Sequence, residues 1–375
     1  MAALYQGTTS VVPQMPQNNA RALAPEGCLS DRMDLIKPNG IELVSMPTQL
    51  PHTPMEICRF SGSKPGPHLL VLGAVHGNET CGPIAIRQIL DALSREEIRI
   101  ISGRVTFIPV ANPDAFTLRQ RAAVRDLNRN FGPVAKPAPG ADFFVNTLCE
   151  TMRDCDVLLD IHSFKAQGSP FLYVGPERPT ALEPFDLSAE ELNFAKALGV
   201  QRMVFGWLAA YDRFVTEQEA LIKRLGPGKV EQADIARHNF GIGTTEYFRS
   251  LGGRYGVTAE CGNHLDETAI ATAREAILSA MAFLGLTEDT GQNVSCGFAE
   301  SYRFERIFVR EDMEDRLARP FSSFDQVRAG ETIGLRKNGT PVVAPADGAV
   351  IFSYADTPVG TEWIYFASES QRGCK

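Results

Sequence analysis

The chain has 375 residues, of which 44% are hydrophobic and 22% charged, as in an ordinary globular protein that can bury a large core. Its formal net charge of −8 argues against a general nucleic-acid binder, because such proteins need a basic face. The eight cysteines form no CxxC pair, the N-terminus has no signal-peptide pattern, and no apolar run is long enough to span a bilayer. We therefore expect a cytoplasmic protein with free thiols and no membrane partner.

Taken in chain order, the sequence divides into three parts. Residues 1–40 are polar and without hydrophobic period, which predicts an extended N-terminal arm. Between residues 41 and 290, apolar strands alternate with amphipathic helices, which is typical of an α/β domain with a mostly parallel sheet. The expected strands are 68–75, 104–110, 156–161, 202–208 and 255–260, and the expected helices are 81–94, 141–152, 187–198 and 266–286. Residues 291–375 change to short β runs with tight turns, which predicts a small all-β domain.

Polar side chains follow several of the predicted strands. His76 comes after one strand with Glu79 three residues later, His162 follows another, and Glu260 closes a third. Ligands of open α/β sheets bind beyond the carboxyl ends of the strands, so these four groups are expected to gather at one edge. The alternative is that His162 only caps its strand and Glu260 pairs with an arginine.

Two imidazoles and one carboxylate form a common ligand set for catalytic zinc, which leaves a fourth position for water or substrate. We therefore predict one Zn²⁺ per chain, held by His76, Glu79 and His162. A carboxylate that does not bind the metal can act as general base, and this role falls to Glu260. His264 is a further candidate to reach the cleft, whereas strand alternation turns Cys261 to the opposite face.

The connection formed by residues 111–133 has no helix or strand period of its own, and loops of this length are usually functional. It concentrates arginines in an acidic protein, which suits an anionic substrate or a developing oxyanion. The alternative for Arg119 and Arg125 is a solvated surface. The arginines are Arg119, Arg121, Arg125 and Arg129.

Four motifs in order, HGNE (76–79), RxxxxDLNR (121–129), DIHS (160–163) and TAECG (258–262), resemble the succinylglutamate desuccinylase/aspartoacylase family of zinc carboxypeptidase-like hydrolases. The resemblance covers roughly residues 65–265. It implies a carboxypeptidase-like fold, with a mixed, mostly parallel sheet flanked by helices, one zinc ion, and hydrolysis of an amide bond by metal-activated water.

The resemblance also implies roles for individual residues. His76, Glu79 and His162 match the zinc ligands, and Glu260 matches the catalytic carboxylate. Further matches give Arg121 as the residue that polarises the scissile carbonyl, Asn128 and Arg129 as the pair that holds a substrate carboxylate, and Asp126 as the partner of the second nitrogen of His76.

The C-terminal part resembles the small, barrel-sandwich-like β domain of many members. Lys337 lacks the flanking methionines of a carrier lysine, so we expect this part to shape the cleft, with Tyr302 or Tyr354 as a candidate to reach it. The predicted function is zinc-dependent hydrolysis of a small N-acylated amino acid or related amine, by a chain that can form a homo-oligomer. The alternatives are a metallocarboxypeptidase that acts on peptide C-termini and an inactive metal-binding regulatory protein.

Overall fold

A computed structural model describes residues 40–44, 54–137, 140–226, 241–288 and 297–374. All of them belong to one compact unit, Leu35–Lys375. The predicted N-terminal arm therefore lies, except for Gly40, outside the described residues. No helix among the described residues combines the length and the apolar character needed to cross a bilayer.

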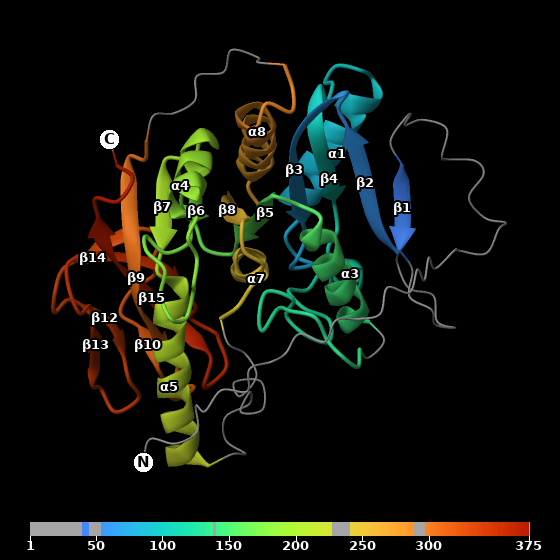
Figure 1. The fold of residues 1–375 in the computed structure, drawn as a ribbon. Helices are drawn as coiled ribbons and strands as arrows, with labels where there is room; N and C mark the ends of the chain where they lie inside the picture. The colour runs from blue at the N-terminus through green and yellow to red at the C-terminus, as the bar shows by residue number, and fades with distance from the viewer. Residues whose placement is uncertain (1–39, 45–53, 138–139, 227–240, 289–296, 375) are drawn as a thin grey trace. The chain divides into compact units, whose positions relative to one another are not determined.

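The main element is a 12-stranded mixed sheet in the order β1-β2-β4-β3-β5-β8-β6-β7-β9-β15-β14-β11 (Figure 1). Its strands are β1 Ile41–Val44, β2 Met55–Ser61, β3 Lys64–Gly73, β4 Ser102–Ile108, β5 Val157–Phe164, β6 Phe171–Tyr173, β7 Arg202–Phe205, β8 Tyr255–Asn263, β9 Glu300–Val309, β11 Asp325–Val327, β14 Gly348–Ser353 and β15 Glu362–Ser370. The four strands β4, β3, β5 and β8 are parallel, and antiparallel strands extend the sheet on both sides. The expected mixed sheet with a parallel centre is confirmed.

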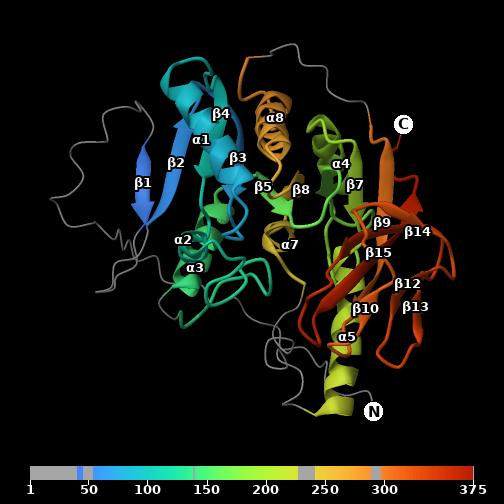
Figure 2. The ribbon, with the colours of Figure 1, turned by 180° about the vertical axis from the view of Figure 1, so that it is seen from behind.

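Helices cover both faces of the sheet centre. They are α1 Cys81–Ser94, α2 Pro113–Leu118, α3 Ala141–Arg153, α4 Ser188–Ala197, α5 Trp207–Leu225, α7 Thr244–Ser250 and α8 Thr268–Phe283. Leu69 and Val71 of β3 pack with the buried side chains of α1, α4 and α8, whereas Leu70 and Leu72 pack with those of α3 and α7. Burial on both faces explains the continuous apolar run of β3. Figure 2 shows the same layers from behind, with α1 and α8 on one side of the strands.

Two predictions about local structure are wrong. The expected strand at 202–208 ends at Phe205, because Gly206 has a φ of 86° and a new helix, α5, begins at Trp207. The connection at 111–133 contains the short helix α2, which starts with Asn112 accepting a hydrogen bond from the Ala115 amide and with Pro113 in the first turn. A cap residue followed by proline is a recognised start signal, so this helix was readable from the sequence.

The C-terminal strands continue the main sheet. β9 pairs in parallel with β7, and β15, β14 and β11 follow in antiparallel order, while β10 Arg316–Leu317, β12 Thr332–Leu335 and β13 Pro341–Val343 form a separate sheet. An apolar cluster that includes Phe308, Trp363 and Phe366 packs inside this region. The predicted boundary near residue 290 lies outside the described residues, and the hydrogen-bonded sheet runs from one predicted domain into the other.

Candidate metal centre

The candidate site lies at the carboxyl ends of three neighbouring parallel strands. His76 and Glu79 belong to the loop between β3 and α1, His162 lies in β5, and Glu260 is its Cα partner in β8. Gly77 fits this loop against α2, since a Cβ there would lie 2.0 Å from the backbone carbon of Ala115. The topology therefore brings together the four groups expected at the sheet edge.

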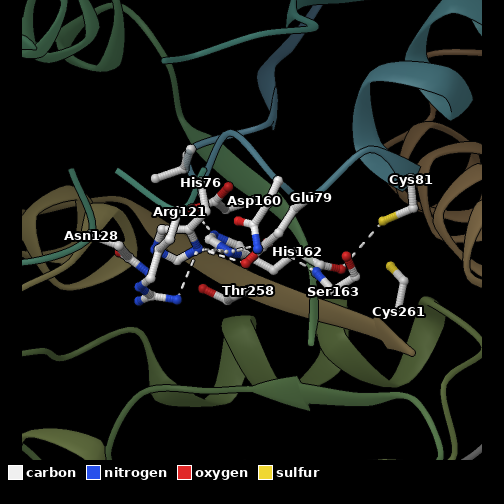
Figure 3. Close-up of polar contacts among 12 residues, drawn as sticks. His76, Glu79, Cys81, Arg121, Asn128, Asp160, His162, Ser163, Thr258 and Cys261 are labelled. Atoms are coloured by element: carbon white, nitrogen blue, oxygen red, sulfur yellow. Dashed lines mark hydrogen bonds and ion pairs between the residues drawn. The ribbon is translucent and has the colours of Figure 1, made fainter. Parts of the chain in front are cut away.

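Three of these side chains converge and are almost fully buried (Figure 3). Nδ1 of His76 lies 2.7 Å from Oε1 of Glu79, and Nδ1 of His162 lies 2.9 Å from Oε2. The two Nδ1 atoms are 3.2 Å apart. Each residue offers one ligand atom to a group whose members all lie within 4.8 Å of one another. This is a donor set that a divalent metal ion fits.

Carboxylates face the outer nitrogens of both imidazoles. Oδ1 of Asp126 lies 3.2 Å from Nε2 of His76, and Oδ2 of Asp160 lies 3.0 Å from Nε2 of His162. Such contacts fix ring orientation and leave Nδ1 free to bind a metal. With Glu79, three carboxylates surround the two imidazoles, and one of them, Asp126, also pairs with Arg121.

The charges of the cluster displace pKa values in the expected directions. Burial acts to lower the pKa of His162, but Asp160 and Glu79 outweigh it and raise that pKa well above its usual value. Burial acts to raise the pKa of Asp126, but Arg121 and His76 outweigh it and hold the pKa of this carboxyl well below its usual range.

Asp160 was not among the sequence-predicted residues. It is fully buried and accepts a hydrogen bond from the Thr244 hydroxyl. The signal was the spacing in DIHS: residues two apart in a strand share a face, so Asp160 points to the same side as His162.

Glu260 is a free carboxylate beside the cluster. Its Oε2 atom is buried and has no hydrogen-bond partner among the described residues. Burial raises the pKa of Glu260 to about 8, although His162 and Arg121 act to lower it. A carboxyl group with a pKa near neutrality can exchange protons in a reaction.

Arg121 borders the cluster and remains accessible. Its Nη1 lies 3.5 Å from Nδ1 of His76, its Nε donates to Asp126 at 2.8 Å, and its side chain is 48% exposed. Burial raises the pKa of Tyr354, whose ring packs against Phe352 and Tyr365. Tyr302 instead donates to Glu300 and accepts from Gln326. That Tyr354 reaches the site stays a prediction.

Asn128 and Arg129 do not contact the donor cluster. Oδ1 of Asn128 accepts from the Thr244 amide at the start of α7, at 3.0 Å. Arg129 is buried, donates to the Tyr211 hydroxyl and to Glu362 at 3.2 Å each, and lies over the rings of Trp207 and Tyr211. Their substrate-binding roles stay predictions.

Two neighbouring groups are accounted for by local contacts. Cys261 lies on the opposite face of β8, where it packs in the same apolar cluster as Cys81 and its thiol donates to the Ala259 carbonyl at 3.5 Å, so it does not face the donor cluster. His264 lies beside the site, with Nδ1 2.8 Å from the Ser163 hydroxyl and Nε2 3.4 Å from the Asn78 amide nitrogen.

Residues 65–284, more than half of the chain, match the family model described as "Succinylglutamate desuccinylase/Aspartoacylase catalytic domain". A shorter stretch of 106 residues is 34% identical to N-alpha-acetyl-L-2,4-diaminobutyric acid deacetylase of Halomonas elongata. That match covers 26% of this chain and only 29% of the relative.

Solved structures show the same fold. A succinylglutamate desuccinylase/aspartoacylase of Rhodobacter sphaeroides aligns with a TM-score of 0.63 and 18% identity over 88% of this chain and 94% of its own. The product-bound ectoine utilization protein EutE (DoeB) of Ruegeria pomeroyi aligns with a TM-score of 0.62 and 17% identity over the same shares, 88% and 94%. These structures therefore share the fold of this chain beyond residues 65–284. The match of the family model over more than half of the chain shows that the chain belongs to the succinylglutamate desuccinylase/aspartoacylase family.

Proposed function

We propose that this protein is a zinc-dependent deacylase that hydrolyses the amide bond of a small N-acylated amino acid or related amine. The observation that carries the proposal is the convergence of His76, Glu79 and His162, with Glu260 and Arg121 at its border. Family membership supports it, and so does the similarity to the Halomonas elongata protein, a deacetylase of an N-acetylated amino acid.

The two histidines and Glu79 would hold the zinc ion, with Asp126 and Asp160 fixing the two imidazole rings. When bound, zinc supplies Lewis acidity, which acidifies water and polarises the acyl carbonyl.

The remaining steps belong to side chains of this chain. Glu260, whose Oε2 atom is unpartnered, accepts the proton of the attacking water and returns it to the leaving amine. Arg121 donates an Nη hydrogen to the carbonyl oxygen as negative charge develops there.

Asn128 and Arg129 are proposed to receive the carboxylate of the amino acid. The Asn128 oxygen is used by Thr244, which leaves its amide NH₂ as a donor. Arginine has five N–H donors, and the contacts of Arg129 with Asn128, Tyr211 and Glu362 use three of them.

The test is amine release by the zinc-loaded protein from N-acetyl, N-succinyl and N-acylaspartyl amino acids and from blocked dipeptides. Glu260→Gln keeps the shape of the side chain and should reduce kcat by about 10²–10⁴-fold, the usual range for loss of a general base. Glu267→Gln, at an exposed glutamate beyond β8, is the matched control and should keep the wild-type kcat.

Each outcome has a distinct meaning. Release from acylated amino acids that depends on Glu260 supports the deacylase. Cleavage of blocked dipeptides alone would identify a metallocarboxypeptidase. Stoichiometric zinc without hydrolysis of any compound would indicate a metal-binding regulatory protein, and near-normal turnover by Glu260→Gln would refute the role of this carboxylate.

A further inference from the structure

Arg129, the residue assigned to a substrate carboxylate, already faces a carboxylate of this chain. Glu362, the first residue of β15, accepts from Nη2 of Arg129 at 3.2 Å and from the Tyr211 hydroxyl at 3.2 Å. The two partners are 233 residues apart in the sequence and come together because β15 extends the main sheet. The C-terminal part therefore places a negative charge beside Arg129, which with Asn128 forms the proposed pocket for the substrate carboxylate.

Aromatic side chains keep this ion pair in place. The Arg129 guanidinium lies 5.1 Å from the ring centres of both Trp207 and Tyr211. Trp207 in turn stacks on Tyr365 of β15, with ring planes 7° apart. Arg129 is only 9% exposed, so it cannot swing away from Glu362 to meet a second anion in another position.

The other arginines of residues 111–133 supply no replacement charge. Arg121 pairs with Asp126, and Arg125 pairs with Asp142 of α3 at 2.8 Å. Arg119 is exposed at the end of α2, where it adopts a left-handed conformation. The dense cationic patch of the sequence is therefore largely neutralised in the fold.

We propose that Glu362 is a specificity-determining residue that offsets the charge of Arg129, so that the pocket selects N-acyl amino acids with a single carboxylate and rejects those with an acidic acyl chain or acidic side chain. The inference rests on the proposed deacylase function. The first carboxylate of a substrate accepts hydrogen bonds from the N–H groups of Arg129 that are still free and from the amide of Asn128. A second carboxylate on the same substrate would be repelled by Glu362.

The first measurement compares kcat/KM of the wild-type protein for N-acetylalanine, N-succinylalanine and N-acetylaspartate. We expect N-acetylalanine to be preferred by about tenfold or more. Equal rates, or a preference for either compound with two carboxylates, would overturn the proposal without any variant.

The second measurement uses Glu362→Gln, which removes the charge and keeps an acceptor for Arg129. The ratio of kcat/KM for N-succinylalanine to that for N-acetylalanine should rise by about tenfold, through KM rather than kcat. Glu369→Gln, at an exposed position of the same strand, removes the same charge and should leave the ratio unchanged. A ratio that is the same in all three proteins would overturn the proposal.

Binding of succinate and acetate by calorimetry separates this proposal from the proposed function. If no compound is hydrolysed, the deacylase function fails, but the charge argument still predicts that Glu362→Gln binds succinate about tenfold more tightly and changes acetate binding by less than about threefold. Equal gains for both anions would indicate a general loosening of the pocket and would refute a role in charge selection.

Discussion

The buried contact between Asp160 and His162 predicts that Asp160 controls metal affinity without touching the metal. Oδ2 of Asp160 lies 3.0 Å from Nε2 of His162, on the side of the ring away from Glu79. Asp160→Asn keeps the shape of this side chain and removes its charge, whereas Asp160→Ala removes the contact.

The expected loss of zinc affinity follows from the effect of the Asp160 carboxylate on the His162 imidazole. The negative charge 3.0 Å from Nε2 favours a proton on that nitrogen, which keeps Nδ1 available and makes the ring a stronger donor. Loss of such a partner typically weakens metal binding by about 10–100-fold, or about 1.4–2.7 kcal/mol. Asp160→Asn should fall near the lower limit, because an amide oxygen keeps a partial negative charge beside Nε2, and Asp160→Ala near the upper limit.

The assay is zinc affinity by competition with a chelator at fixed pH, together with the thermal midpoint of the metal-free protein. Asp156→Asn is the control, since Asp156 immediately precedes the same strand but accepts from the His68 amide, away from the site. If folded Asp160→Ala bound zinc within twofold of the wild-type affinity, the inferred orientation of His162 would be wrong.

The sequence predicted the candidate site best where its residues lie at the ends of strands. Apolar runs that predict buried strands precede each of these residues: His76 with Glu79, His162 and Glu260. Parallel pairing of the strands then places the four side chains at one edge of the sheet. Helix α1 was predicted with its observed bounds, because its apolar spacing is regular and a strand and a loop precede it.

Residues that depend on long-range pairing could not be placed. Glu362 meets Arg129 only because β15 joins the sheet beyond β9, and local periodicity does not encode the partner of an antiparallel strand. Arg129 was assigned to substrate from the family resemblance of its local motif, whereas its ion-pair partner Glu362 is remote in the sequence. The pocket's charge is therefore a property of the fold rather than of the motif.

Two further predictions concern stability. Gly77→Ala should destabilise the protein by at least about 1–3 kcal/mol and weaken zinc binding, because its Cβ would overlap the α2 backbone. Urea unfolding measures the change, with Gly40→Ala as the control because nothing lies within 4 Å of a Cβ there. Wild-type stability of Gly77→Ala would contradict the close approach. Glu183, whose carboxylate lies 3.0 Å from Arg249, tests pH dependence. Burial, reinforced by the charges of Glu246 and Glu191 and opposed by Arg249, raises its pKa from 4.5 to about 7, so the folded state retains a proton that the unfolded chain loses. The contribution of Glu183 to the free energy of unfolding is thus fully present below pH 4.5 and is lost as the pH rises to about 7. At about 1.4 kcal/mol per pH unit, the loss is about 3 kcal/mol. Glu183→Gln should remove this decline, and the control Glu177→Gln, at a nearby exposed position, should retain it. If the free energy of unfolding of the wild type and of Glu183→Gln changed in parallel between pH 4.5 and 7.5, Glu183 would have an ordinary pKa.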